Sequence, residues 1–117
     1  MSIDAISLLS ALGHETRLRC VLLLRRHAEL CVCELTEATT LAQPHVSRHL
    51  GQLRNAGVLQ DRRDGLWIHY RIHPDMPDWV RDMLRNLDRG IGDSAPFTED
   101  RTRLAAMSDR PGKSRCA

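Results

Sequence analysis

The sequence predicts a mainly α-helical chain with one small β-hairpin, an α+β fold. Apolar residues recur at helical spacing in several separate segments of the 117 residues. One stretch, residues 66–72, alternates instead between apolar and polar positions, and it follows an Asp-Gly pair that tight hairpin turns favour. Aromatic residues make up only 3% of the chain, so Leu, Val and Ile must supply most of the core.

The first part of the chain predicts two helices, a short extended segment and a third, brief helix. Residues 4–12 form an amphipathic helix whose apolar stripe is Ile6, Leu9 and Leu12. Residues 14–27 form a second helix, in which Cys20 lies among apolar neighbours and is expected to be a small core residue. Residues 29–33 are β-prone, and residues 34–39 form the brief helix.

The middle of the chain predicts a longer helix followed by the hairpin. The helix runs from Pro44, a residue suited to the first position, to about Ala56, and Gly57 ends it. Its buried stripe is Val46, Leu50 and Leu53. Residues 58–62 and 66–72 are the two strands, joined by a turn at 63–65.

The last part of the chain divides at residue 90. Residues 77–89 form a helix with the apolar stripe Val80, Met83, Leu84 and Leu87. We expect residues 1–90 to be the folded domain and residues 91–117 to be a C-terminal linker with a short helix at 98–107. From Ser108 onward the composition cannot build a core, which predicts a flexible tail.

A short helix, a turn, a second helix and a hairpin together make a winged helix-turn-helix. With the stripe of the 44–56 helix turned inward, at about 100° per residue, its outer face is polar. Residues 43–63 carry four arginines against one aspartate, a charge of +3 in a chain whose net charge is +2. His49 lies near the inward side and is expected to be half-buried and structural. The candidate DNA contacts are Gln43, His45, Ser47, Arg48, Gln52, Arg62 and Arg63.

The four cysteines are the second informative group. The first residues contain an acid and no base, which argues against a secretion signal, so we expect a cytoplasmic protein with free thiols. Cys31 and Cys33 lie two positions apart, on one side of an extended segment at the start of a helix. A helix N-terminus lowers a thiol pKa, and thiolates select soft ions. This pair is the candidate metal site.

Three segments carry a resemblance: ELCVCEL at 29–35, QPHVSRHLGQLRNAGVL at 43–59 and DRRDGLWIHYRI at 61–72. They resemble the ArsR/SmtB family of winged-helix metalloregulatory repressors, and most of all its arsenic-responsive branch. The resemblance implies a homodimer that binds operator DNA and leaves it when trivalent arsenic or antimony binds the Cys31 and Cys33 thiolates. It implies no constitutive cofactor. The implied dimer interface lies on the first and last helices of the domain, at Ile6, Leu9, Leu12, Val80, Met83, Leu84 and Leu87.

One position departs from that pattern. The arsenic-responsive branch often has a third Cys three residues after the second, where this chain has Thr36. The remaining candidates for a third ligand are a small-molecule thiol or hydroxide, Cys116 of the tail, and, as the weakest, Cys20.

Other functions fit parts of the same residue set. A cadmium- or lead-responsive repressor could use the same Cys pair, and a thiol-redox switch could use Cys20 or Cys116. A zinc or nickel sensor would need His on the 77–89 helix, which has none. The chain carries no motif that pairs a nucleophile with a base and no Gly-rich phosphate loop, so an enzyme is not expected. It also has no stretch near the roughly 20 apolar residues of a membrane helix.

Overall fold

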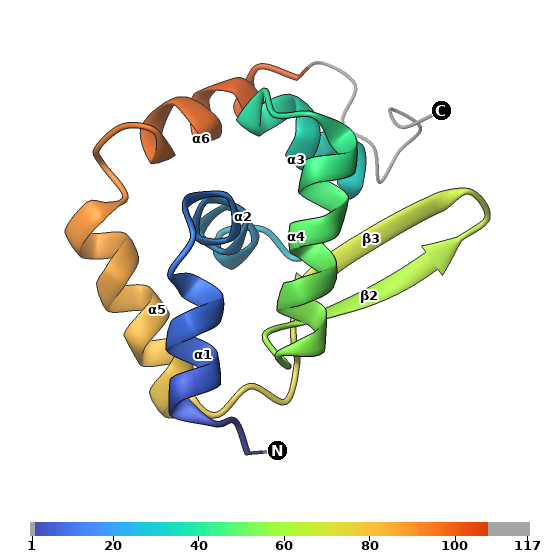
Figure 1. The fold of residues 1–117 in the computed structure, drawn as a ribbon. Helices are drawn as coiled ribbons and strands as arrows, with labels where there is room; N and C mark the ends of the chain where they lie inside the picture. Colours follow the sequence, from blue (N-terminus) through green and yellow to red (C-terminus); the bar gives the residue numbers. More distant parts are fainter. Residues whose placement is uncertain (1, 108–117) are drawn as a thin grey trace.

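The computed structural model describes residues 2–107, and these form six helices and a small sheet (Figure 1). The elements in chain order are α1 (Ala5–Leu12), α2 (Glu15–Arg25), β1 (Leu30–Cys31), α3 (Val32–Thr39), α4 (Gln43–Asn55), β2 (Leu59–Asp64), β3 (Trp67–Ile72), α5 (Asp78–Ile91) and α6 (Phe97–Ala105). The mainly α-helical fold with a winged helix-turn-helix is confirmed. Each expected helix is present, with ends shifted by at most two residues. The prediction for residues 108–117 lies outside the described residues.

Helix α2 is the centre of the structure. Figure 1 shows it nearly end-on, with the other helices arranged around it. It packs against α1, α3, α4, α5, α6 and β3. Five consecutive residues, Cys20 to Leu24, are buried, because neighbours cover the helix on almost every side. The expectation that Cys20 is a core residue is confirmed.

The sheet has three antiparallel strands in the order β1-β3-β2, one more than the hairpin alone. The added strand is the β-prone segment, which places Leu30 opposite Tyr70 and Cys31 opposite His69. The hairpin turn, expected at 63–65, lies at Gly65 and Leu66, because Asp64 pairs with Trp67. Gly65 has φ +63°, a left-handed conformation that glycine adopts without strain. Leu66 therefore belongs to the turn, not to the strand, and it is 92% exposed.

Helix α6 shares the core of the rest of the chain. It packs mainly against α3 and α2, and its Leu104 is buried together with Met107. The division at residue 90 stays a prediction, but the packed unit continues to Met107. In the part of the chain that the structure describes, no helix is long and apolar enough to cross a membrane.

Candidate nucleic-acid interface and thiol site

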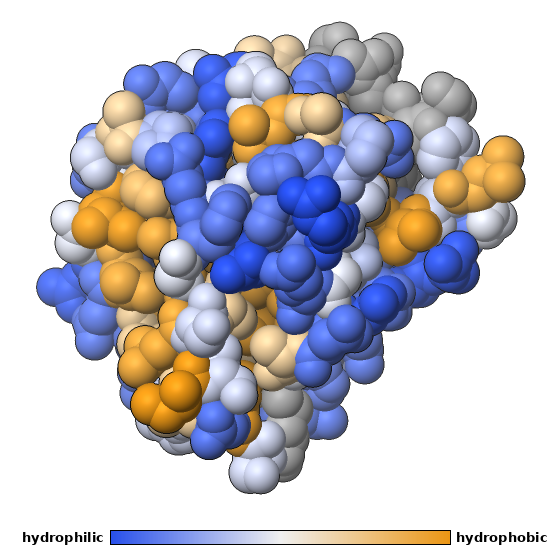
Figure 2. All heavy atoms as spheres, in the orientation of Figure 1, coloured by the Kyte–Doolittle hydropathy of each residue, from blue (hydrophilic) through white to orange (hydrophobic). Residues whose placement is uncertain are grey.

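The recognition helix, α4, buries the stripe that its sequence predicts. Val46, Leu50 and Leu53 are fully buried, and α4 packs against α2, α3 and β2. The helix starts at Gln43, so Pro44 occupies its second position. The predicted contacts Gln43, Arg48 and Gln52 are exposed, whereas His45 and Ser47 are half-buried. Figure 2 shows hydrophilic side chains gathered over this helix and along the wing, which is the β2–β3 hairpin.

Three histidines, the histidine cluster, pack where the start of α2 meets α4. The ring of His49 stacks on His14 at a centroid distance of 4.3 Å and meets His45 edge-on at 4.5 Å. His49 is buried, more deeply than the half-burial predicted, and its structural role stays a prediction. Desolvation, followed by the charges of His14, His45, Arg17 and Arg48, lowers its pKa to about 4. His49 is therefore neutral at physiological pH.

Arg17 joins three helices at this cluster, a role that no pattern in the sequence indicates. Its guanidinium donates to the carbonyls of Ala11 (2.6 Å) and Ser10 (3.2 Å) at the end of α1. It also donates to His49 Nδ1 (3.1 Å) and Gln52 Oε1 (2.5 Å) on α4. Arg17 therefore fixes the rotation of the recognition helix against α1 and α2, and it holds the side chain of Gln52 in place.

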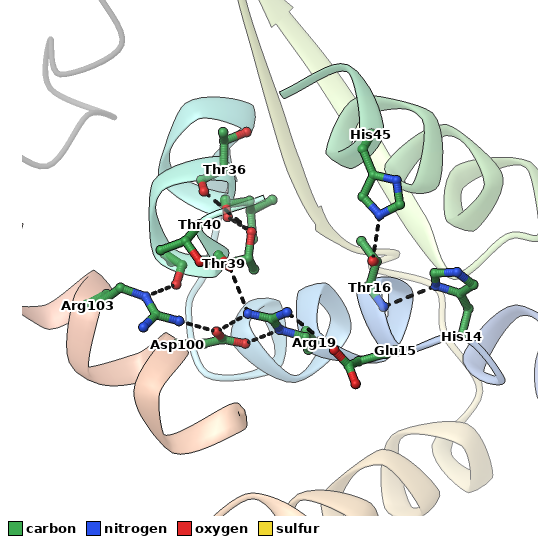
Figure 3. A network of polar contacts seen from close by, with 12 residues as sticks. His14, Glu15, Thr16, Arg19, Thr36, Thr39, Thr40, His45, Asp100 and Arg103 are labelled. Atoms are coloured by element: carbon green, nitrogen blue, oxygen red, sulfur yellow. Dashed lines mark hydrogen bonds and ion pairs between the residues drawn. The ribbon is translucent and has the colours of Figure 1, made fainter. Parts of the chain in front are cut away.

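His45 is held from two sides, which bears on its predicted contact with DNA. Its Nε2 lies 2.8 Å from the hydroxyl of the buried Thr16, on α2 (Figure 3). Its Nδ1 lies 3.2 Å from Nη2 of the exposed Arg48. Both ring nitrogens are thus engaged within the protein, and Arg48 is the side chain of this pair that extends into solvent.

The wing carries its two predicted arginines in different surroundings. Arg62 donates to both carboxylate oxygens of Glu29, at 2.6 and 3.2 Å, and this hydrogen bonding lowers the pKa of Glu29. Arg63 lies next to the turn and is exposed. Arg62 therefore anchors the wing to the loop before β1, whereas Arg63 extends beside the turn toward solvent.

The thiol pair, Cys31 and Cys33, lies where the sheet meets α3. Cys31 ends β1 and caps α3, and its Sγ lies 3.0 Å from the Sγ of Cys33. The Cys31 N–H donates to the carboxylate of the buried Glu34 (2.9 Å), which fixes the backbone at the helix start. The predicted extended-to-helix backbone is confirmed, and it brings both sulfur atoms to one place.

The protein supplies few further ligands to the thiol pair. Among residues 2–107, no group of three or more His, Cys, Asp or Glu side chains is arranged to hold a metal ion. Burial raises the pKa of Cys20 to about 12, which keeps it protonated and makes it a poor ligand. Thr36 lies one turn after Cys33, and its buried hydroxyl oxygen has no hydrogen-bond partner within the described residues. Cys116 lies outside those residues.

The far end of α3 is fastened by two arginines that share one carboxylate (Figure 3). Arg19 donates to the carbonyl of Thr39 (2.9 Å), and Arg103 donates to that of Ala38 (2.6 Å). Asp100 of α6 accepts from Arg19 through both oxygens and from Arg103 at 2.9 Å. Carbonyls at a helix C-terminus lack intrahelical partners, so these bonds stabilise that end of α3. Sequence reasoning missed this arrangement, because Arg103 lies 65 positions from Ala38 and Arg19 lies 81 positions from Asp100.

The predicted dimer residues fall into two groups. Leu12, Val80 and Leu84 are buried inside the single chain, because α1 and α5 use them to pack on their own core. Met83 and Leu87 are partly buried, while Ile6 and Leu9 are 75% and 55% exposed. Trp79, which was not predicted, is half-exposed. The apolar surface of α1 and α5 thus includes fewer of the predicted residues than the stripes suggested.

The order α3, turn, α4 and wing, with a basic polar outer face, defines a winged helix-turn-helix DNA-binding protein. A family model described as "Bacterial regulatory protein, arsR family" matches residues 14–61. The arsenic resistance transcriptional regulator ArsR1 of Pseudomonas putida is 51% identical over 102 residues, which are 86% of this chain and 77% of that protein. The chain therefore belongs to the arsR family and is a DNA-binding repressor of transcription, not an enzyme.

Solved structures agree with this assignment. HlyU from Vibrio cholerae superposes with a TM-score of 0.65 and 32% identity, covering 73% of this chain and 88% of that one. The AntR antimony-specific transcriptional repressor superposes with a TM-score of 0.61 and 34% identity, covering 69% of this chain and 70% of that one.

Proposed function

We propose that this protein represses an arsenical resistance operon and is released from its operator when trivalent arsenic or antimony binds the Cys31 and Cys33 thiolates. The observation that carries the proposal is the 3.0 Å separation of the two sulfur atoms at the start of α3. The similarity to the arsenic resistance regulator ArsR1 and to the antimony-specific repressor AntR supports arsenic and antimony as the inducers. Such a repressor works in the cytoplasm, where thiols stay reduced.

Helix α3 supplies the route from the thiol pair to DNA. Its first residues follow Cys31 directly, it packs against α4, and Arg19 and Arg103 fasten its last turn. A ligand that draws two sulfur atoms onto one ion changes the start of α3 while the end stays held. The helix then tilts against α4 and displaces the recognition face. By thermodynamic reciprocity, operator DNA weakens inducer binding by the same factor.

The repressor acts as a homodimer in this proposal. Two copies present two recognition helices to successive major grooves, so the operator is a palindrome. Ile6, Leu9 and Trp79 are exposed apolar side chains on α1 and α5, and Met83 and Leu87 add partly buried area. In this proposal Gln43, Ser47, Arg48 and Gln52 face the groove, Arg63 contacts a phosphate, and Arg62 contacts DNA only if it exchanges its bond to Glu29 for a phosphate.

The test is a gel-shift titration on the DNA upstream of the protein's own gene, with arsenite, antimonite, cadmium, zinc and peroxide in parallel. We expect arsenite and antimonite to release the wild-type protein. The double variant Cys31→Ser/Cys33→Ser should bind the operator with unchanged affinity and stay bound in arsenite. If arsenite still released that variant, the arsenite-binding site would not be the Cys31 and Cys33 pair. Release by cadmium or peroxide in place of arsenite would establish one of the alternative inducers.

Two single variants define the third ligand. Cys116→Ser keeps the thiol pair and removes the tail thiol, and Thr36→Val keeps the shape of α3 and removes its buried hydroxyl. If arsenite is held by the thiol pair with a solvent thiol or hydroxide, both variants respond as the wild type does. A loss of response in one variant assigns the third ligand to that residue.

A further inference from the structure

A cavity of about 420 Å³ opens between the end of α2, the base of β3 and α5. Four arginines line it: Arg25 from α2, Arg71 from β3, and Arg81 and Arg85 from α5. Its described lining contains no Asp or Glu. These arginines carry four formal positive charges in a chain whose net charge is +2, so positive charge is concentrated at this cavity, the arginine pocket.

Two of the guanidinium groups are oriented by uncharged acceptors. Arg81 donates to the backbone carbonyls of Pro74 (2.9 Å), His73 (3.2 Å) and Met76 (3.2 Å). Arg71 donates twice to the amide oxygen of Gln60, at 2.9 and 2.6 Å. These bonds hold the side chains without cancelling their charges. A guanidinium that is already oriented loses less entropy when it binds an anion.

The other two arginines have carboxylate neighbours that engage them weakly. Asp88 accepts two 2.8 Å hydrogen bonds from Arg26, and Arg25 Nε lies 3.5 Å from the same carboxylate. That Nε is buried and has no hydrogen-bond partner within residues 2–107. Arg85 pairs at 3.2 Å with Asp82, but both side chains are more than half exposed, so water competes for the pair.

Apart from the four arginines and His27, the lining is apolar. Leu24 and Ala28 come from α2 and the residues after it, Ile72 from β3 and Leu84 from α5. The cavity volume lies within the roughly 300–1,000 Å³ typical of small-molecule sites, where apolar walls and a few fixed polar groups share the binding. The lining therefore suits a molecule with an anionic group and an apolar or planar body.

We propose that the arginine pocket binds a small organic phosphate. Guanidinium groups match phosphate oxygens in paired hydrogen bonds, and a phosphate monoester carries close to two negative charges, which suits several arginines better than a single carboxylate would. The phosphate group lies between Arg71, Arg81 and Arg85, and the body of the molecule packs on Leu24 and Ile72. The pocket lining shares no residue with the thiol pair or with α4.

The test is isothermal titration calorimetry on the full chain with AMP, inorganic pyrophosphate and inorganic phosphate. We expect one AMP per chain, bound more tightly than inorganic phosphate. Arg85→Glu should weaken AMP binding about tenfold or more, the effect of removing one strong charged hydrogen bond. The control is Arg89→Glu, which makes the same charge change at an exposed position one turn further along α5, outside the pocket lining. It should bind within about twofold of wild type, because charges outside a site act weakly in salt.

Arg71→Gln should independently reduce the affinity for AMP. The melting temperature of each variant verifies that it is folded. If the Arg85 and Arg89 variants lost AMP affinity equally, the protein would attract anions only through its general charge, and the proposal would be overturned. Absence of binding by all three probes would overturn it as well, and equal affinity for AMP and inorganic phosphate would rule out a role of the apolar lining. A further titration uses a short DNA duplex without operator sequence. If Arg85→Glu weakened binding of this duplex but not binding of AMP, the arginine pocket would be a site for the DNA backbone, and the proposal would be overturned.

Discussion

Asp100 accepts a hydrogen bond from Arg19 on each of its carboxylate oxygens, at 2.8 and 2.7 Å, although 81 positions separate the two residues. Both side chains are buried, at 1% and 7% exposure. The pair fastens α6 to α2 and, through the bond from Arg19 to Thr39, to the last turn of α3. A buried guanidinium of this kind depends on its carboxylate, because water cannot replace it.

Replacement of Asp100 by Ala should therefore be strongly destabilising. We expect the free energy of unfolding to fall by about 3–5 kcal/mol, the cost of leaving a buried charge uncompensated. Urea denaturation followed by circular dichroism measures it. The matched control is Asp93→Ala, because Asp93 also pairs with an arginine, Arg101, but is 92% exposed. That change should cost at most about 1 kcal/mol. Similar losses in both variants would contradict a special role for Asp100.

Acid should destabilise the protein through His49. Its folded-state pKa, about 4, lies below the ordinary value of 6.5. As pH falls below 6.5 the unfolded chain takes up a proton that the folded chain refuses, so stability is lost from pH 6.5 down to about 4. Over that window the loss attributable to His49 reaches about 3 kcal/mol. Denaturation at a series of pH values measures the slope of the free energy of unfolding against pH. His49→Gln should make this slope shallower.

The control for that series is His73→Gln, which changes a half-buried histidine outside the histidine cluster. It should leave the slope between pH 6.5 and 4 close to that of the wild type. A slope that His49→Gln leaves unchanged would show that carboxylates or the other histidines set the acid sensitivity.

Arg63 should act on DNA through charge alone. It is exposed on the wing, so we expect it to bind a phosphate. Arg63→Gln should weaken operator binding and lower the slope of log affinity against log salt by about one for each phosphate that the variant no longer neutralises. Fluorescence anisotropy at several salt concentrations measures this. Arg89→Gln removes the same charge from α5 and should leave the slope unchanged. An effect of equal size from both variants would indicate net charge as the cause.

Leu9 offers a test of the proposed dimer. It is 55% exposed on α1, so Leu9→Glu alters the surface while the core stays intact. We expect the variant to sediment as a monomer at concentrations where the wild type is a dimer, because an interface core does not tolerate an unpaired charge. Leu66→Glu adds the same group to the wing turn, where Leu66 is 92% exposed, and should sediment as the wild type does. A dimeric Leu9→Glu protein would place the interface elsewhere.

Periodicity predicted the recognition helix well, because burial of Val46, Leu50 and Leu53 follows from a spacing that is local in the chain. The thiol pair was also predictable, since its geometry depends on three consecutive residues. On α1 the spacing did not separate the core face of the helix from its exposed face. The core takes Leu8 and Ala11 together with Leu12, and it leaves Ile6 and Leu9 outside. Several choices of stripe fit so short a helix, and only packing against α2 decides between them.

The hydrogen bonds that hold the site were not predictable from spacing. Arg17 reaches Gln52 across 35 positions, and Arg103 reaches Ala38 across 65. Many arginines in this chain could make such bonds, and the sequence does not say which carbonyl or carboxylate will be near. These choices follow from how α1, α4 and α6 pack around α2.

Cys31 belongs to two structural elements at once: it pairs with His69 on the wing strand β3, and it is the residue from which α3 begins. A displacement of its backbone can therefore be transmitted by two routes. One route crosses the sheet into the wing, and the other follows α3 to α4. Helix α4 and the β2–β3 hairpin, the two elements that we propose contact DNA, are therefore both connected to this one residue. A variant that interrupts one route should still transmit part of the effect of inducer binding through the other.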